Sequence, residues 1–376
     1  KHDISLKQIF EIAQKSEIFY RETISSSFIM QQLDQFFGEI LNNLNKQINS
    51  LTDEEAKNIM TYDQDLIISP LYLKTPRIDN QVFLGNKAYY LKKLYIDGYP
   101  IPQGFVITTE IFRRINEILK IESFNNSVDQ LVKKQVNELE KMTGKEFGNS
   151  SNPLLLSVRS GSAISMPGAM NTFLNVGLND QITEELSKVD NFAWTSWDCY
   201  RRLIQTWGMS HGLDRDKFDQ IIFNYKKKFK VSQKIDFKPS VMREIAFEYK
   251  KLLSEYNIAF EEDPFLQLKK AIISVFHSWN TPRAIAYRKH MQIAEEWGTA
   301  VTIQKMVLGN IHRESGSGVV FTKDEQDPDD VLNLTGDFSF LSQGEDIVGG
   351  LVKTLPISEK QKVKGSYNSQ ISLEST

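Results

Sequence analysis

Residues 154–180 read LLLSVRSGSAISMPGAMNTFLNVGLND, and the interpretation of the whole chain starts from this stretch. It opens with an apolar run of strand length, Leu154–Val158, and Arg159 follows directly. Small residues, among them Gly161 and Gly168, fill the segment that comes next. Arginine offers a planar fork of hydrogen-bond donors, and glycine lets backbone N–H groups approach an anion closely. The pattern predicts a strand that leads into an anion-binding loop, but an ordinary loop with a surface arginine explains it equally well.

From Ser157 to Asp180 the sequence resembles the nucleotide-binding segment of the pyruvate phosphate dikinase family. Further segments resemble the same domain in the same order: LGNKAYYLKKLYIDGYPIPQGFVITTE (84–110), FAWTSWDCYRRLIQTWG (192–208), AIISVFHSWNTPRAIAYRKH (271–290), WGTAVTIQKMVLGN (297–310), SGSGVVFTKD (315–324) and SQGEDIVGG (342–350). The resemblance covers about residues 80–355. It implies an α+β fold of the ATP-grasp type in several subdomains, with ATP and Mg²⁺ as cofactors.

The composition is that of an ordinary globular protein. The chain has 376 residues, of which 40% are hydrophobic and 25% are charged. The net charge of −3 provides no global attraction for nucleic acid or for an anionic membrane, so we expect neither as a partner. Cys199 is the only cysteine, which excludes an intrachain disulfide and favours a cytoplasmic location.

Four regions are expected along the chain. Residues 1–60 predict a helical N-terminal extension, because apolar residues between Ile29 and Ile48 recur at helical spacing and Thr52 with Glu55 forms a capping box. Residues 61–82 are interpreted as a linker, residues 83–358 as the ATP-grasp domain and residues 359–376 as a polar tail. The extension is either a helical pair packed on the main domain or a partner-binding arm, which leaves a homodimer possible.

Periodicity predicts the elements inside the main domain. Strands are expected at 105–108, 154–158, 299–307, 318–322 and 332–341, and helices at 84–99, 180–189, 193–208, 262–280 and 282–290. Two amphipathic helices are expected within 110–143, and solvated helices within 214–251. Strand 299–307 and strand 318–322 are expected to form a β-hairpin, with residues 315–318 on the side of its tip.

The resemblance also implies site residues. Lys87 follows Gly85 at a helix start, where free N–H groups favour a phosphate, although such a lysine is also common on a solvated surface. In the family the matching loop reads G-G-K-G and its lysine contacts the nucleotide phosphates, whereas this chain has Gly85-Asn86-Lys87-Ala88. The resemblance implies catalytic roles for Lys87 and Arg159, with Gly168 and Thr172 lining the anion loop.

Other residues are implied to contact the nucleotide. Gln304, Met306 and Val307 would meet the base, although Met306 and Val307 also suit a sheet core. Ser315, Gly316, Ser317 and Gly318 would close over the triphosphate, and Asp337 stands where the family usually has glutamate in Y-G-E-Y. The metal ligands stay unknown.

Three further residues, two arginines and a histidine, are candidates for a functional role. Arg201 and Arg202 suit a helix surface, and the resemblance raises the alternative that one of them faces a phosphate-rich cleft. His211, in MSHG, is not interpreted as a phosphorylated histidine, because the family carries that residue on a separate domain in a T-S-H-A context.

Two functions follow. The first is the ATP-binding, phosphoryl-donating part of a pyruvate phosphate dikinase-like enzyme, which would phosphorylate a histidine on a partner domain. That domain is expected in cis beyond Thr376 or in trans, and the magnesium-holding strands of the family are also expected beyond this chain. We therefore expect poor phosphoryl transfer by the chain alone. The alternative is a degenerate nucleotide-binding or interaction module, favoured by the altered lysine loop and by Asp337.

Overall fold

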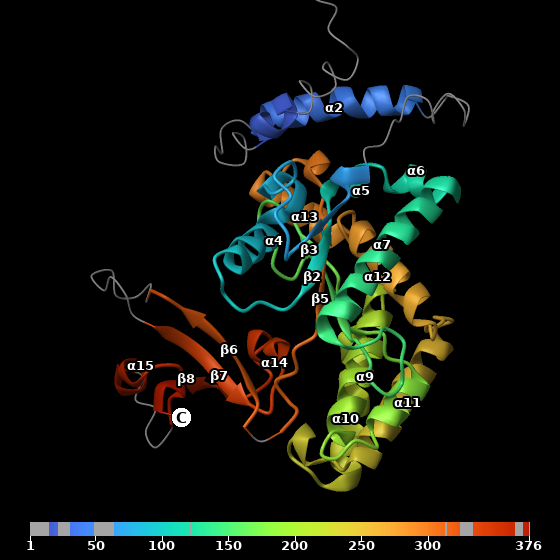
Figure 1. Cartoon of the computed structure of the whole chain (residues 1–376). Coiled ribbons are helices and arrows are strands. Elements are labelled where there is room, and N and C mark those ends of the chain that lie inside the picture. The colour runs from blue at the N-terminus through green and yellow to red at the C-terminus, as the bar shows by residue number, and fades with distance from the viewer. Residues whose placement is uncertain are drawn as a thin grey trace, which may run out of the picture.

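The structure is a computed structural model that describes residues 15–21, 31–48, 64–120, 122–312, 314–323, 334–364 and 371–375. Within these residues the chain forms two antiparallel sheets and several layers of helices, which is a mixed α+β architecture as the sequence predicts (Figure 1). None of the described helices is both long and apolar enough to cross a membrane.

The larger sheet has five strands in the order β1-β2-β5-β3-β4. Its members are β1 (Ile68–Pro70), β2 (Gly104–Ile107), β3 (Leu156–Gly161), β4 (Thr172–Val176) and β5 (Ala300–Lys305), and every neighbouring pair is antiparallel. β5 occupies the centre, between β2 and β3, and its first five residues are all buried. The predicted strand at 154–158 therefore extends further, so that Arg159 lies inside β3 rather than in the loop after it.

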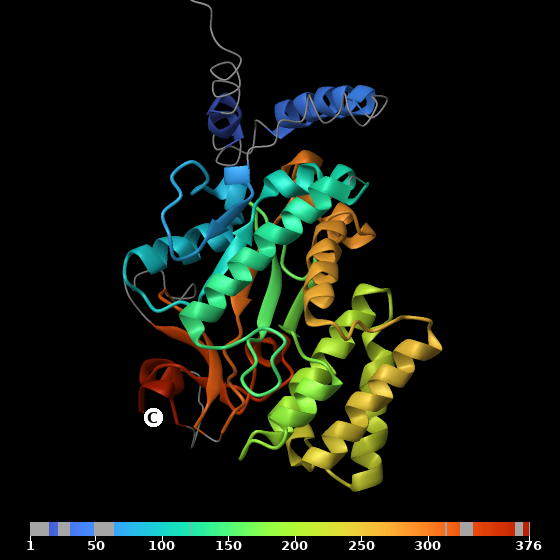
Figure 2. The ribbon, with the colours of Figure 1, turned by 45° about the vertical axis from the view of Figure 1, so that its right-hand side comes forward.

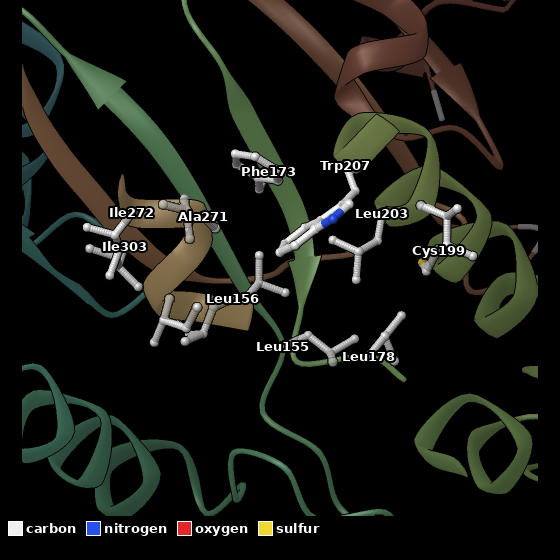
Figure 3. Close-up of a cluster of buried hydrophobic side chains, with 14 of the residues drawn as sticks. Leu155, Leu156, Phe173, Leu178, Cys199, Leu203, Trp207, Ala271, Ile272 and Ile303 are labelled. Atoms are coloured by element: carbon white, nitrogen blue, oxygen red, sulfur yellow. The ribbon is translucent and has the colours of Figure 1, made fainter. Parts of the chain in front are cut away.

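Helices cover both faces of this sheet. On one face α4 (Gln81–Ile96) packs Leu84 and Ala88 against Val106 and Ala300. On the other face α9 (Ala193–Ser210) and α12 (Pro264–Ser278) bury the main core, to which α7 (Glu122–Thr143) also contributes. Figure 3 shows this core, with Phe173 of β4 beside Trp207 of α9. The alternating residues of β3 and β5 consequently divide between two differently covered faces.

The remaining helices complete the lobes on either side. They are α5 (Thr109–Arg113), α6 (Ile115–Lys120), α8 (Asp180–Leu186), α10 (Arg215–Phe229), α11 (Pro239–Glu255) and α13 (Pro282–Met291). The expectation of two helices within 110–143 is wrong, because three occur there, α5, α6 and α7. The expectation of solvated helices within 214–251 is wrong for α11, which buries Val241, Ile245 and Tyr249 where it packs along α9.

The smaller sheet consists of β6 (Gly316–Phe321), β7 (Thr335–Phe340) and β8 (Leu355–Pro356), with the short helix α14 (Gly344–Val348) against β6. The predicted hairpin of 299–307 with 318–322 is wrong, because β5 pairs with β2 and β3 whereas β6 pairs with β7. Residues 316–318 pair with 338–340 at the end of β6 opposite the connection to β7, and so do not form a tip.

Two predicted boundaries also differ. Residues 64–82 are not a linker, because β1 is an edge strand paired with β2 and Ile67 beside it lies in the main core. The polar tail contains structure as well: α15 (Glu359–Lys364) is a helix, and Ser372 is buried next to the turn η5 (Leu373–Ser375).

The N-terminal extension is helical where it is described, at residues 15–21 and in α2 (Gln31–Ile48), which lies across one end of the molecule (Figures 1 and 2). Arg113 of α5 forms an ion pair with Glu17 at 2.6 Å and fixes the first piece to the main domain. α2 contacts the main domain, since Gly38 is buried against Glu296 and Asn42 Nδ2 donates to Glu296 Oε1 at 3.4 Å. The apolar residues Phe36, Phe37, Ile40 and Leu41 are nevertheless 43–57% exposed, so the expected burial of the stripe is wrong for these four. A partner-binding arm stays a prediction, and Thr52 and Glu55 lie outside the described residues.

Candidate phosphate site

The lysine loop sits against the end of the arginine strand. Gly85 interrupts α4 with φ 72° and ψ 161°, a combination that side-chain-bearing residues hardly adopt. A Cβ added at Gly85 would lie 2.3 Å from the carbonyl oxygen of Gly161. One residue later, the N–H of Asn86 donates to the carbonyl oxygen of Ser162 at 2.9 Å. The start of the main part of α4, which carries Lys87, is thereby held at the end of β3.

Arg159 lies in a cross-strand row on the face of the sheet that α4 covers. It stands opposite Thr172 of β4 on one side and Thr302 of β5 on the other. Thr302 is buried, whereas Arg159 and Thr172 are half-buried. Because directly opposite residues of an antiparallel pair project from the same face, Arg159 and Thr172 are presented side by side. Sequence reasoning placed both residues near one anion, and the register brings them together.

The electrostatics of Lys87 and Arg159 tie the two residues to one place. Loss of solvation lowers the pKa of Lys87, and the positive charge of Arg159 lowers it further. Burial lowers the pKa of Arg159, against which the carboxylate of Glu345 acts. In the described part of the chain no carboxylate lies within 4.0 Å of Lys87 or of the Arg159 guanidinium. Two cations therefore share a position without an ion-paired carboxylate.

Glu345, on α14, is the acidic residue whose charge raises the pKa of Arg159. Burial raises the pKa of Glu345 itself, whereas the charges of Arg202 and Arg159 oppose that rise. The sequence motif SQGEDIVGG contains this residue, but sequence reasoning assigned it no role. Its position places α14, and with it the smaller sheet, on the border of the candidate site.

The anion loop between β3 and β4 is held at both ends. At its start, the N–H of Gly161 donates to Thr299 Oγ1 at 3.1 Å. At its end, the N–H of Asn171 donates to Ser278 Oγ at 3.1 Å. Gly168 has φ 67° and faces Arg283 of α13, whose Nη2 would lie 3.2 Å from an added Cβ. The loop that sequence reasoning singled out is thus a fixed structure with a third arginine beside it.

The three residues expected to meet a base differ in their surroundings. Gln304 is buried in β5, and its amide donates to the carbonyl oxygen of Pro102 at 3.0 Å. Met306 lies just past β5 and packs against the main core, which is one of the two readings the sequence allowed. Val307 is 72% exposed, so its alternative assignment to a sheet core is wrong.

The residues expected over the triphosphate lie in the smaller sheet. Ser315 precedes β6, and Gly316, Ser317 and Gly318 are part of it. Ser317 Oγ donates to the carbonyl oxygen of Ser342 at 2.8 Å, which joins β6 to the start of α14. Asp337 stands opposite Val319 in β7 and accepts a hydrogen bond from Thr354 Oγ1 at 2.9 Å.

The paired arginines form a second, neutralised cluster. Asp198 of α9 accepts Arg201 at 2.7 Å, Arg202 at 2.8 Å and Lys234 at 3.2 Å. Arg202 also reaches Asp346 of α14 at 2.6 Å. All except Lys234 are buried, so the expectation of a helix surface is wrong. The spacing of Asp198, three and four residues before the arginines, is the signal that could have predicted these ion pairs.

The pKa values of this cluster follow from its burial and its charges. Burial opposes ionisation of Asp198, but Arg202, Lys234 and Arg201 outweigh it and hold the pKa well below the usual range. Burial lowers the pKa of Lys234 to about 8, although Asp198 acts against this. Burial, together with the charge of Asp198, raises the pKa of the Cys199 thiol to about 12. The cluster is therefore a fixed ionic connection between α9 and α14.

Comparison with known proteins bears on the identity of this site. The family model described as "Pyruvate phosphate dikinase, AMP/ATP-binding domain" matches residues 82–372, which is most of the chain. The chain belongs to this family. The match includes the smaller sheet, every strand of the larger sheet except β1 and every residue of the candidate site, and it extends through most of the segment expected to be a polar tail.

The sequences of curated relatives support the same family assignment. The chain is 39% identical over 275 residues to the pyruvate, phosphate dikinase of Rickettsia bellii, 37% over 282 residues to that of Rhizobium meliloti and 36% over 286 residues to that of Giardia intestinalis. These alignments cover 73–76% of this chain but only 31–32% of the relatives. The chain therefore spans about a third of the length of the pyruvate, phosphate dikinases it matches.

Proposed function

We propose that this dikinase-family domain binds Mg–ATP between the Arg159 face of the larger sheet and α14 with the smaller sheet, in the manner of an ATP-grasp domain. It then donates a phosphoryl group to a histidine on a partner domain, as the first part of the conversion of ATP, phosphate and pyruvate to AMP, diphosphate and phosphoenolpyruvate. The observation that carries the proposal is the docking of the Gly85 loop on Gly161. It brings Lys87 and Arg159 together with no carboxylate of the described chain paired to either.

The proposed roles follow from charge and position. Lys87 and Arg159 neutralise phosphate oxygens, since charge-assisted hydrogen bonds to phosphate are stronger than neutral ones. Thr172, beside Arg159, and Gly168 line the loop around the phosphates. Residues 304–307, at the end of β5, border the base. Ser315–Gly318 and Asp337 face the nucleotide from the smaller sheet, with Glu345 between the two sheets.

Magnesium has no preformed cage in the described part of the chain, where no three His, Cys, Asp or Glu side chains gather at one point. Asp346 is engaged by Arg202, which leaves Glu345 as the carboxylate beside Arg159. Glu345 would therefore be the residue that helps to hold a Mg²⁺ ion arriving with the nucleotide, since this ion is commonly bound through one or two carboxylates together with substrate phosphates. Bound there, it would neutralise charge on the transferring phosphoryl group.

Thermal unfolding with and without Mg–ATP tests the assignment of Arg159. At about a hundredfold excess of nucleotide over Kd, binding to the folded state alone adds roughly 2.7 kcal/mol to the unfolding free energy. Arg159→Met should remove most of this gain. Arg243→Met is the matched control, because Arg243 of α11 is half exposed and its partners are Glu184 and the rings of Trp197 and Phe247. A gain that survives Arg159→Met undiminished would refute the role of Arg159.

Transfer to histidine is tested separately. The chain is mixed with the histidine-bearing remainder of a relative, and AMP formation is measured with Mg²⁺, phosphate and pyruvate present. Lys87→Met should lower the rate of AMP formation, whereas the matched control Lys188→Met should leave it unchanged. This result would support phosphoryl donation. A nucleotide-binding chain that forms no AMP would favour the second candidate.

That second candidate is a nucleotide-binding or interaction module without kinase activity. Two observations favour it: Lys87 follows Asn86 where the family has glycine, and the carboxylate of Asp337 is already held by Thr354. The exposed apolar stripe of α2 would serve as its interaction surface, including a homodimer contact.

A further inference from the structure

A pocket lies at the end of the anion loop, where Asn171 precedes β4. Its volume is about 350 Å³, which falls within the range of small-molecule sites, and it is formed by the C-terminal end of α9, by α12 and by Asn171 and Phe173 at the start of β4. Asn171 and Phe173 line it. Because these residues alternate with Thr172, they project from the opposite face of β4, away from Arg159. The pocket is therefore separate from the proposed nucleotide site.

The ionisable residues that line this pocket are all basic. They are His211 at the end of α9 and Lys270 and His277 on α12. Lys270 is partly neutralised, because it pairs with Glu261 at 2.5 Å. His277 is exposed and forms no side-chain hydrogen bond to any residue that the structure describes. A ligand in this pocket therefore meets two imidazole rings, which donate hydrogen bonds to an anion when protonated, beside a lysine that is already paired.

His211 is oriented so that one nitrogen is available. Its Nδ1 lies 2.8 Å from the carbonyl oxygen of Trp207, which fixes a proton on Nδ1, and the ring stacks on the Trp207 indole at 5.8 Å between centroids. The neutral ring then has a lone pair at Nε2, and the protonated ring has an N–H there. An anion selects the protonated ring and gains a charge-assisted hydrogen bond.

The pocket also has apolar lining residues. Phe173 and Trp207 are both buried in the main core and meet edge to face at 5.9 Å between centroids (Figure 3). Ile273 of α12 adds an aliphatic wall. Aromatic and aliphatic walls of this kind suit a compact planar group, while the imidazoles at the rim suit negatively charged oxygens.

We infer that this pocket binds a small organic anion, a phosphate or carboxylate carried on a compact planar apolar body. Neighbouring hydroxyl groups support this class, because Ser274 and Thr281 also line the pocket and can donate to anionic oxygens. The ligand would touch the end of the anion loop, since Asn171 and its partner Ser278 both line the pocket. It would also touch Thr281, which caps α13, the helix whose Arg283 faces Gly168.

Three probes of similar size test the inference: phenyl phosphate, benzoate and the uncharged benzyl alcohol. Binding is measured by calorimetry and by the imidazole resonances of the five histidines. The two anions should bind and shift the resonances of His211 and His277, and benzyl alcohol should bind at least tenfold more weakly. Failure of both anions to bind at millimolar concentration, or equal binding of benzyl alcohol, would overturn the proposed ligand class.

Variants locate the binding. His277→Ala and His211→Ala should each weaken phenyl phosphate binding about tenfold, while His290→Ala, on the exposed surface of α13, should leave it unchanged. The urea midpoint of each variant establishes that it is folded. Arg159→Met, at the nucleotide site, should also leave phenyl phosphate binding unchanged. If Arg159→Met abolishes binding and the histidine variants do not, the anion occupies the phosphate site and binding in this pocket is refuted, whatever the outcome for ATP.

Discussion

Two groups of cations in this molecule are treated in opposite ways. Arg201, Arg202 and Lys234 converge on Asp198, and Arg202 also reaches Asp346, so the protein supplies the anions itself. The contact of Gly85 with Gly161 brings Lys87 near Arg159, yet no carboxylate pairs with either among the described residues. The first group is closed and structural, and the second is left open.

The difference has a physical basis. A buried charge without a partner is costly, so a fold that keeps cations inside normally provides carboxylates for them. Where it does not, burial lowers the pKa values of the cations, as it does for Lys87 and Arg159, and the charge of Arg159 lowers the pKa of Lys87 further. Such a pair is stabilised by an anion from outside. A structural ion cluster and a ligand site can therefore be distinguished by whether the chain completes the charge balance.

The largest expected effect on stability is that of a substitution at Asp198. Asp198→Asn should destabilise the fold by about 3–5 kcal/mol, because it leaves Arg201, Arg202 and Lys234 without their shared carboxylate. Urea unfolding measures the change. Arg159→Met, tested without nucleotide, should leave the unfolding free energy unchanged or raise it, since it removes a half-buried cation that no carboxylate pairs with. Similar losses in the two variants would show that the two groups do not differ.

A smaller effect is expected at Gly85, which positions the open pair. Gly85→Ala should cost about 1–3 kcal/mol, because φ 72° with ψ 161° is strained for alanine and the added Cβ would clash with the Gly161 carbonyl. The matched control is Gly98→Ala, also at positive φ but with no atom within 4 Å of an added Cβ. Urea unfolding should therefore give a larger loss for Gly85→Ala. Equal losses would mean that contact with Gly161 contributes nothing beyond backbone strain.

The sequence predicted the elements better than their partners. Alternation in Thr299–Val307 and helical spacing in Glu262–Asn280 correspond to β5 and α12, because both patterns depend only on local periodicity. The partner of β5 could not be found that way, since its neighbours β2 and β3 lie far earlier in the chain. Burial of β5 on both faces is the mark of a central strand, whereas β6 alternates and lies in another sheet.

The site was predicted in part for the same reason. The residues Lys87 and Arg159 came from a family resemblance, and the structure explains their proximity through a backbone contact that no side-chain pattern encodes. Thr172 was placed in a loop but begins β4, a strand with a bulge, where Asn175 has φ 60° and interrupts the expected alternation. The ionic cluster of Asp198 was missed although its i, i+3 and i+4 spacing was visible in the sequence.

The last expected effect is a pH dependence that arises at Lys234. Its pKa is lowered to about 8 in the folded protein by burial, whereas an unfolded lysine titrates near about 10.4. Between these values the unfolded chain holds one more proton than the folded chain, so unfolding free energy rises with pH in this window. Below about pH 7 both states hold the proton and the term is constant. Methionine does not titrate, so the unfolding free energy of the wild type minus that of Lys234→Met isolates the contribution of Lys234.

That difference in unfolding free energy should be flat from pH 6 to pH 7 and should increase from pH 8 to pH 10, measured by urea unfolding at each pH. Lys188→Met is the matched control, because Lys188 is exposed and its hydrogen bond to Glu185 raises its pKa, the opposite direction to that of Lys234. The corresponding difference for Lys188 should not increase from pH 8 to pH 10. If the difference for Lys234 is instead flat, Asp198 keeps this lysine charged in the folded protein. The carboxylate would then fully compensate the burial of Lys234, and the ionic cluster would differ from the Lys87–Arg159 pair more than the lowered pKa of Lys234 indicates.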